Sequence, residues 1–245
     1  AATSLALGAC GQRTAPADSG PFAHLSSRAK EATPIAGQEY LDRQVRAREL
    51  MHSAGLDAIV VAEGTSLTYF TGAKWWGSER LFAFVLPAKG AAFIVCPAFE
   101  EARAREQVQV ASEKGELDVR TWQEDQNPYD LLAQGLRDRG IATGRVGLEE
   151  NVRFVFADGI ARSAPGLHLQ SATPVTAGCR MVKSEHEIAL MRLASEVTLA
   201  AYEATWKALK VGMTGSEITT LSRQAHEALG FEGAADLVLI GAASS

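Results

Sequence analysis

The fold class is decided by the stretch from Leu117 to Gln170, in which short apolar runs alternate with segments of helical length. In chain order it reads LDVRTW (117–122), PYDLLAQGLRDR (128–139), RVGL (145–148), VRFVFADGIARS (152–163) and LHLQ (167–170). Strands separated by helices of about ten residues indicate an α/β layer with a partly parallel sheet. We therefore predict a mixed-sheet α/β domain built around this stretch.

The residues before this stretch extend the same layer. The apolar spacing over 39–54 predicts a helix that ends at Gly55, and a short apolar run over 57–62 predicts a strand. Further along we predict a turn with a short helical piece at 64–72, hairpin strands at 81–86 and 91–96, and a helix at about 98–110.

The pattern changes at Thr173-Pro174. A long helix is predicted over 184–209, a second helix starting at Thr214 or Ser216 and ending at Leu229, and a terminal strand over 236–240. A domain that stops on its first strand is incomplete. We therefore predict one complete α/β domain over 38–172 and the start of a second domain over 173–245.

Composition and charge exclude several classes of protein. The chain has 245 residues, 24 basic and 29 acidic side chains and a net charge of −5, with the two signs interspersed. This balance disfavours a nucleic-acid binder that relies on a basic face. There is no apolar run long enough to span a bilayer. GxGxxG does not follow the first strand and GxxxxGK[ST] is absent, so a nucleotide is not an expected ligand.

The N-terminal residues 1–37 read as a processing segment and a flexible tether. Leu7-Gly8-Ala9-Cys10 resembles a bacterial lipobox, which makes Cys10 a candidate for lipidation. The stretch that follows is rich in Ala, Ser, Pro, Gly and Thr. We predict an exported, periplasmic or membrane-anchored lipoprotein. The alternative is an Ala-rich leader with an incidental Cys in a cytoplasmic protein.

Cys96 and Cys179 complete the set of three cysteines. Wide spacing argues against a disulfide scaffold or a zinc ribbon, which need closely spaced pairs. We predict two buried thiols that act as small apolar side chains, and a Cys96–Cys179 disulfide stays open as the alternative.

The histidines do not form a metal motif. HExxH places two histidines on one helical face, but Leu190 follows His186 at the required spacing and Gly230 follows His226. We predict that both are polar-face residues of helices. GxSxG is absent as well, so we predict no catalytic residue and no metal ligand in this chain. The remaining histidines, predicted as surface or half-buried, are His24, His52 and His168.

The most unusual local feature is a loop that carries two adjacent indoles, Trp75 and Trp76, between Lys74 and Glu79-Arg80. Two exposed indoles would cost solubility, and Trp and Arg are favoured anchors of binding surfaces. The alternative is that at least one Trp belongs to the core of its own domain.

Several motifs together resemble the creatinase and Xaa-Pro peptidase family, the pita-bread metallopeptidases. Arg180-Met-Val-Lys183-Ser184 with Glu187-Ile188 resembles the opening of the first long helix of the catalytic domain, and Gly212-Met-Thr214 with Glu217-Ile218 resembles the opening of the second. Leu67-Thr-Tyr-Phe-Thr-Gly72 resembles a turn of the N-terminal domain. The resemblance covers about residues 38–245.

This resemblance implies a creatinase/prolidase-like N-terminal α/β domain followed by the first helices and strand of a pita-bread α+β domain. It implies an Xaa-Pro dipeptidase or aminopeptidase that uses two divalent metal ions, Mn, Co or Zn, to activate water. The metal ligands are expected C-terminal to residue 245, because the stretch Asp236–Gly241 resembles the strand that precedes the family's substrate-binding His. If that stretch were aligned with the metal-binding strand instead, Gly241 would stand where the family requires Asp. In relatives the N-terminal domain packs against a neighbouring subunit and lends it aromatic residues. The substrate-lining candidates are Trp75, Trp76 and Arg80.

The expected partners are proline-containing peptides, a second copy in a homodimer, and the C-terminal remainder of the catalytic domain, with no nucleic acid. Because a fold does not determine a reaction, two other functions stay open. One is a creatinase-like small-molecule hydrolase or lyase on the same scaffold. The other is a non-catalytic dimerisation or binding module.

Overall fold

The computed structural model describes residues 20–108, 117–232 and 238–241. The lipidation candidate Cys10 therefore lies outside the described residues. The chain divides into two compact units, a larger one over Pro34–Ser184 and a smaller one that joins Ala1–Thr33 to Glu185–Ser245.

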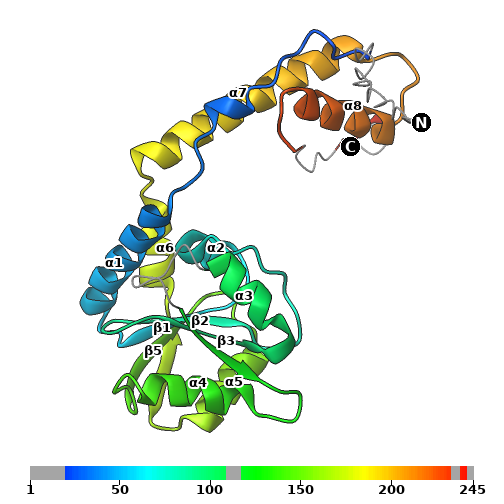
Figure 1. Ribbon diagram of the computed structural model, residues 1–245. Helices are drawn as coiled ribbons and strands as arrows, with labels where there is room; N and C mark the ends of the chain where they lie inside the picture. Colours follow the sequence, from blue (N-terminus) through cyan, green and yellow to red (C-terminus); the bar gives the residue numbers. More distant parts are fainter. Residues whose placement is uncertain (1–19, 109–116, 233–237, 242–245) are drawn as a thin grey trace, which may run out of the picture. The chain divides into compact units, whose positions relative to one another are not determined.

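The larger unit is built on a six-stranded sheet with the order β4-β3-β2-β1-β5-β6. Strand β2 is antiparallel to its neighbours β1 and β3, whereas the other pairs are parallel. The sheet is therefore mixed, as predicted (Figure 1). Its strands are β1 (Ala58–Val61), β2 (Ala83–Pro87), β3 (Phe93–Pro97), β4 (Asp118–Trp122), β5 (Gly144–Leu148) and β6 (Leu167–Ser171).

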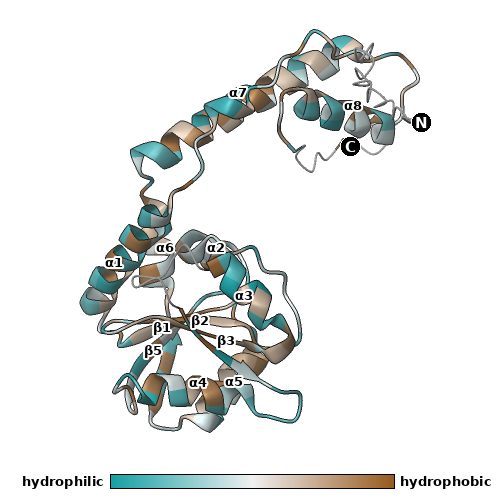
Figure 2. Cartoon of the chain, viewed as in Figure 1, coloured by the Kyte–Doolittle hydropathy of each residue, from teal (hydrophilic) through white to brown (hydrophobic). Residues whose placement is uncertain are grey.

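Helices cover both faces of this sheet, which Figure 2 shows as largely apolar strands between two helical layers. One layer holds α1 (Gly37–Ala54), α2 (Thr65–Thr71), α3 (Glu101–Val108) and α6 (Thr173–Met181), and the other holds α4 (Pro128–Arg137) and α5 (Phe154–Ser163). Side chains alternate along β1: Ile59 and Val61 pack into the first layer, and Ala58 and Val60 into the second. Both faces of the central strands are thus buried, which explains their continuous apolar runs.

Several predicted boundaries are confirmed. Gly55 ends α1 with a left-handed φ of 64°, a conformation that glycine adopts without strain. Strands β2 and β3 form the predicted antiparallel hairpin. The helix predicted at 98–110 begins as a short 3-10 turn, Ala98–Glu100, before α3.

Helix α6 was not anticipated from the sequence. It begins at the predicted domain boundary, because Pro174 stands in the first turn, where proline is well tolerated. Val175 and Cys179 of this helix are buried in the core of the larger unit. The compact unit therefore extends to Ser184 instead of ending at residue 172.

The smaller unit contains α7 (Glu185–Ala208) and α8 (Gly215–Ala228). Helix α8 begins with a capping box in which Thr214 Oγ1 accepts from the Glu217 backbone N–H and the Glu217 carboxylate accepts from Thr214. Phe22 is buried against α7 and α8, and Arg28 pairs with Glu196 at 2.9 Å. Residues 20–33 are therefore packed, and the prediction of a tether there is wrong, because Phe22 supplies an apolar anchor.

The strand predicted over 236–240 is described only for residues 238–240, which are not in a strand. Residues 236 and 237 lie outside the described residues. Among the helices that the structure describes, none is both long and apolar enough to cross a membrane.

Candidate functional site at the carboxyl edge of the sheet

Candidate functional side chains lie where the parallel strands end. Because β2 runs opposite to the other five strands, the loop that precedes β2 meets the carboxyl ends of the others at one edge of the sheet. This carboxyl edge carries Glu63 after β1, Phe99 after β3, Glu124 after β4 and Glu149 after β5. Loops at such an edge are the usual place for binding groups on a rigid scaffold.

The tandem tryptophans of the loop before β2 have opposite environments. Trp75 is buried and stacks on Phe82, with ring centroids 4.0 Å apart, and the Arg103 guanidinium lies 4.1 Å from its ring. Trp76 is 82% exposed. The prediction that at least one indole belongs to the core is confirmed for Trp75, and only Trp76 is free to contact another molecule.

The third predicted site residue, Arg80, lies at the same edge. Its Nε donates to Glu124 Oε1 at 2.7 Å, and it also pairs with Glu79. The hydrogen bond with Glu124 holds the pKa of Arg80 above its usual value, so the guanidinium stays charged. Its Cζ lies 5.7 Å from the ring centroid of Phe99, an exposed aromatic side chain that the sequence analysis did not single out.

The loop is tied to its surroundings on both sides. The backbone N–H of Lys74 donates to Gln107 Oε1 at 2.9 Å, and Arg153 Nη1 donates to the Ser78 carbonyl at 2.6 Å. These bonds fix the loop to α3 and to the start of α5. Trp76 is therefore presented from an anchored backbone, which lowers the entropic cost of using it for binding.

A second polar cluster lies beside the loop. Glu149 is buried, and its Oε2 has no hydrogen-bond partner among the described residues. Burial raises the pKa of Glu149, and a hydrogen bond from Ser66 opposes this effect. The charges of Glu150 and Glu63 raise the pKa further, and the charge of Arg180 lowers it. The Arg180 guanidinium donates to Ser66 Oγ at 3.1 Å.

This cluster gives a structural role to the Arg-x-x-Lys motif. Arg180 reaches the carboxyl edge, while Lys183 Nζ donates to the Arg180 carbonyl at 2.5 Å at the end of α6. Glu149 was missed by the sequence analysis. The available signal was its position as the first residue after the strand β5.

The cysteines are structural. Cys96 and Cys179 are buried free thiols, as predicted, and they form no disulfide with each other. Burial raises the pKa of Cys96 to about 12 and that of Cys179 to about 11, so neither is a thiolate nucleophile near neutral pH.

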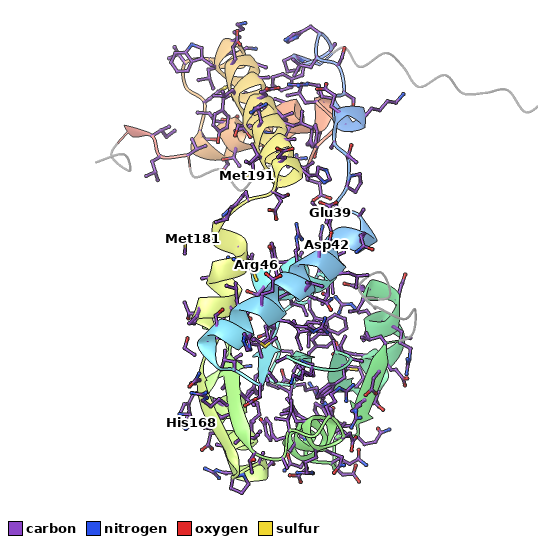
Figure 3. The ribbon with its side chains drawn as sticks, turned by 90° about the vertical axis from the view of Figure 1, so that its left-hand side faces the viewer. Glu39, Asp42, Arg46, His168, Met181 and Met191 are labelled. Carbon is purple, nitrogen blue, oxygen red and sulfur yellow. The ribbon has the colours of Figure 1, made fainter. Side chains whose placement is uncertain are left out.

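The histidines follow the predictions with one exception. His24, His52 and His168 are exposed, and His168 is seen at the surface of β6 in Figure 3. His186 lies 3.0 Å from the Thr33 carbonyl. His226 was predicted on a polar face, but it is buried on the inner side of α8, so that prediction is wrong. Among the described residues, no group of three or more His, Cys, Asp or Glu side chains could hold a metal ion, so the two ions implied by the resemblance do not fit this part of the chain.

Comparison with known proteins places this geometry in a family. Residues 43–182 match the family model of the creatinase/prolidase N-terminal domain. The chain is 29% identical over 221 residues to a probable dipeptidase PepE of Mycobacterium tuberculosis, covering 83% of this chain and 53% of that protein. It is 24% identical over 198 residues to the ectoine hydrolase of Halomonas elongata, covering 76% of this chain and 48% of that protein.

The fold has a close counterpart among solved structures. The crystal structure of the dipeptidase PepE from Mycobacterium ulcerans matches with a TM-score of 0.70 and 28% identity, over 80% of this chain and 51% of that chain. The predicted fold class is thereby confirmed. The chain spans about half the length of the relatives it matches. Because the family model covers more than half of its residues, the chain belongs to the creatinase/prolidase family, whose N-terminal domain it contains.

Proposed function

We propose that this chain is the N-terminal part of a dinuclear-metal, proline-specific peptidase, an Xaa-Pro dipeptidase or aminopeptidase that hydrolyses the Xaa-Pro amide bond. The observation that carries the proposal is the family match over residues 43–182, together with relatives that are named dipeptidases. The alternation of strands and helices alone would fit many enzymes, because one fold supports many reactions.

The proposal assigns the metal ions to polypeptide that follows residue 245, and the bound ions would be Mn, Co or Zn. The described residues offer no set of metal ligands. What this chain contributes is therefore binding and orientation of the peptide, and not the attack on its amide bond.

In this proposal Trp76 lines the site in which a peptide is held. An indole offers a large apolar surface that packs well against a proline ring, at a low cost in side-chain entropy. The supporting geometry is the contrast between the exposed Trp76 and the buried Trp75, on a loop anchored by Gln107 and Arg153. Arg80 is the nearby cation, held in place by Glu124 and available to a peptide carboxylate.

The test is Trp76→Ala in the complete protein, with kcat/KM measured for an Xaa-Pro dipeptide. We expect a loss of about tenfold, equivalent to about 1.4 kcal/mol of transition-state binding. The matched control is Phe154→Ala on α5, because Phe154 is 83% exposed and lies outside the loop. Equal kcat/KM values for the parent and Trp76→Ala would remove the substrate-lining role.

A second candidate function is hydrolysis of a small molecule by the same family scaffold, as in creatinase. The specific observation that favours it is the similarity to a protein named ectoine hydrolase. A panel of Xaa-Pro dipeptides, dipeptides without proline, creatine and ectoine, assayed at one enzyme concentration, separates the two candidates. Turnover of creatine or ectoine above that of every dipeptide would favour the second.

A non-catalytic dimerisation or binding module is the third possibility. Metal analysis of gel-filtered protein, with every polypeptide weighed intact, distinguishes it from an enzyme. About two transition-metal ions per chain, with a polypeptide that carries the ligands, support a dinuclear hydrolase. Protein of 26.1 kDa without metal and without turnover would favour the module.

The proposal also places the protein outside the cytoplasm, anchored through a lipidated Cys10, and working as a homodimer. The sequence Leu7-Gly8-Ala9-Cys10 supports the first part, and the exposed Trp76 supports a neighbouring subunit. Detergent partitioning of the natural protein and of a Cys10→Ser variant tests the anchor. Sedimentation velocity tests the dimer.

A further inference from the structure

The residue after strand β5 carries a buried carboxyl group that the proposed function does not use. Glu149 is 3% exposed, and its Oε2 has no hydrogen-bond partner among the described residues. A buried oxygen without a donor costs much more free energy when it is ionised than when it is neutral. The surroundings of Oε2 therefore favour a carboxyl group that keeps its proton.

One hydroxyl group lies between this carboxyl group and a cation. Ser66 of α2 is fully buried, and its side chain forms a hydrogen bond with Glu149. The same hydroxyl oxygen accepts a hydrogen bond of 3.1 Å from Arg180 Nη1 on α6, so its own proton is donated to the carboxyl group. Because one hydroxyl links the two groups, Arg180 can reach Glu149 by a change of side-chain conformation alone.

The charged groups that act on Glu149 come from three segments. Glu63 follows β1, Glu150 is the next residue in the chain, and Arg180 lies in the last turn of α6. The two carboxylates oppose ionisation of Glu149, whereas Arg180 favours it. Glu150 is also an acceptor for α6, because Thr176 Oγ1 donates to it at 3.1 Å. Of these three charged groups, Arg180 is the one that can pair with an ionised Glu149.

The bond between Arg180 and Ser66 joins two helices that are far apart in sequence. The two residues are separated by 114 positions, and both helices lie on the same face of the sheet (Figure 1). Helix α2 leads into the loop that carries Trp76, and α6 ends at Met181, shortly before the larger unit ends at Ser184. A change of partner by Arg180 therefore releases α2 from α6 ahead of the Trp76 loop.

We propose that Glu149 is a proton-dependent switch for Arg180: the protonated carboxyl group leaves Arg180 on Ser66, and the ionised carboxylate takes Arg180 as its own donor. The step releases one proton from Glu149 to solvent and exchanges one hydrogen bond for another. Burial raises the pKa of Glu149, so the exchange takes place at a higher pH than the ionisation of an exposed glutamate. The inference does not depend on the proposed function, because it involves only described residues of the larger unit.

The test measures amide hydrogen exchange in the complete protein at pH 4 and pH 8, for peptides that cover α2 and α6. Each rate is converted into a protection factor, which removes the intrinsic effect of pH on exchange. We expect Arg180→Gln to lower the protection of α6 about tenfold at pH 8, because a buried, ionised Glu149 loses its partner. At pH 4 the loss should be about twofold, because only the bond to Ser66 is removed.

Two further variants serve as controls. Glu149→Gln keeps the shape of the carboxyl group and makes it permanently neutral, so in this background Arg180→Gln should cost about twofold at both pH values. Arg153→Gln is the matched control, because Arg153 lies at the same edge of the sheet and donates to the Ser78 carbonyl. Its effect on protection should be the same at pH 4 and pH 8.

Infrared spectroscopy provides a second readout that does not depend on stability or on any arginine variant. The spectrum of the parent minus that of Glu149→Gln isolates the C=O stretch of the protonated carboxyl group. We expect this band to persist above pH 4.5, the ordinary pKa of a glutamate, and to be absent at pH 8.

Three results would overturn the proposal. The first is an equal effect of Arg180→Gln at the two pH values in the parent. The second is a pH-dependent effect that remains in the Glu149→Gln background, which would make Glu63 or Glu150 the partner of Arg180. The third is a carboxyl band that is already lost at pH 4.5, and this result decides alone if Arg180→Gln does not fold.

Discussion

The two units of this chain differ in how completely they bury their apolar side chains. The larger unit has a core on each face of its sheet, in which long apolar side chains such as Phe84 and Leu132 are fully buried. The described residues of the smaller unit form one small core, and Leu199 and Trp206 of α7 are exposed among them. The family model ends at residue 182, close to the end of the larger unit. The contrast lies in the described residues of each unit: the larger has a core on both faces of a sheet, and the smaller has a core between two helices and residues 20–33.

The largest expected effect tests whether the larger unit unfolds independently of the smaller unit. Phe84→Ala removes a fully buried ring from β2 and should lower the unfolding free energy of the larger unit by about 4 kcal/mol. Hydrogen exchange followed by mass spectrometry measures each unit separately. Protection in the strands should fall, and protection in α7 and α8 should stay unchanged. Equal losses of protection in both units would mean that they unfold together, which would contradict the distinction between them.

The next effect compares one substitution in the two units. A Cβ at Gly135 would collide with the Phe93 ring where α4 packs on β3, so Gly135→Ala should cost about 2 kcal/mol. In the smaller unit a Cβ at Gly215 would lie 3.2 Å from the Val238 carbonyl oxygen. Val238 lies outside helix and strand, and we expect its carbonyl to move by the few tenths of an ångström that a Cβ requires, so Gly215→Ala should change the unfolding free energy by less than about 0.5 kcal/mol. Urea denaturation measures the unfolding free energy of both variants. A cost at Gly215 as large as that at Gly135 would show that the smaller unit is packed as tightly there as the larger unit.

A smaller effect concerns the buried carboxyl group of Glu149 in the larger unit. Glu149→Gln should raise the unfolding free energy at pH 8 by about 1 kcal/mol, because it removes a charge that burial disfavours. The pKa of Glu149 is raised in the folded state, so its stabilising contribution is present at low pH and is lost as the pH rises through the folded pKa.

The difference between Glu149→Gln and the parent should therefore be near zero at pH 4 and grow toward pH 8. Urea denaturation at a series of pH values measures it. A difference that shrinks as the pH rises would show that Ser66 and Arg180 stabilise the ionised form more than burial opposes it.

The smallest expected effect is at the exposed face of helix α7 in the smaller unit. Trp206→Gln should change the unfolding free energy of the 245-residue chain by less than about 0.5 kcal/mol, because Trp206 is 75% exposed there. The same substitution at the buried Trp75 should cost about 3 kcal/mol and serves as the matched control. Thermal denaturation checks both, and a large cost at Trp206 would mean that this face is already covered.

Much of the larger unit was predictable because each element carries a local signal. The apolar runs of β1, β2 and β3 are buried on both faces, and Gly55 marks the end of α1 through its left-handed conformation. Helix α6 escaped prediction because its nine residues, TPVTAGCRM, include few strong helix formers. It is helical because Val175 and Cys179 pack in the core, and that packing depends on the tertiary structure.

The candidate site was predictable only in part. The loop with Trp75, Trp76 and Arg80 was found from its composition, but two adjacent indoles in a sequence do not show which one is buried. Phe82 decides this by stacking on Trp75. Glu149 was missed because a carboxylate after a strand usually faces solvent, and its burial becomes visible only when Ser66 and Arg180 from distant segments close over it.

By itself, the sequence determined the class of the fold, the order of its strands and helices and the family resemblance, because hydrophobic period, turn residues and short motifs are local properties of the chain. The tertiary structure alone decided that Phe22 anchors the N-terminal segment, that His226 lies inside, and that α7 keeps one apolar face exposed. These features depend on which surfaces meet across long separations in sequence. A pattern along one helix shows that a face is apolar, and only the packing around it shows whether that face is covered.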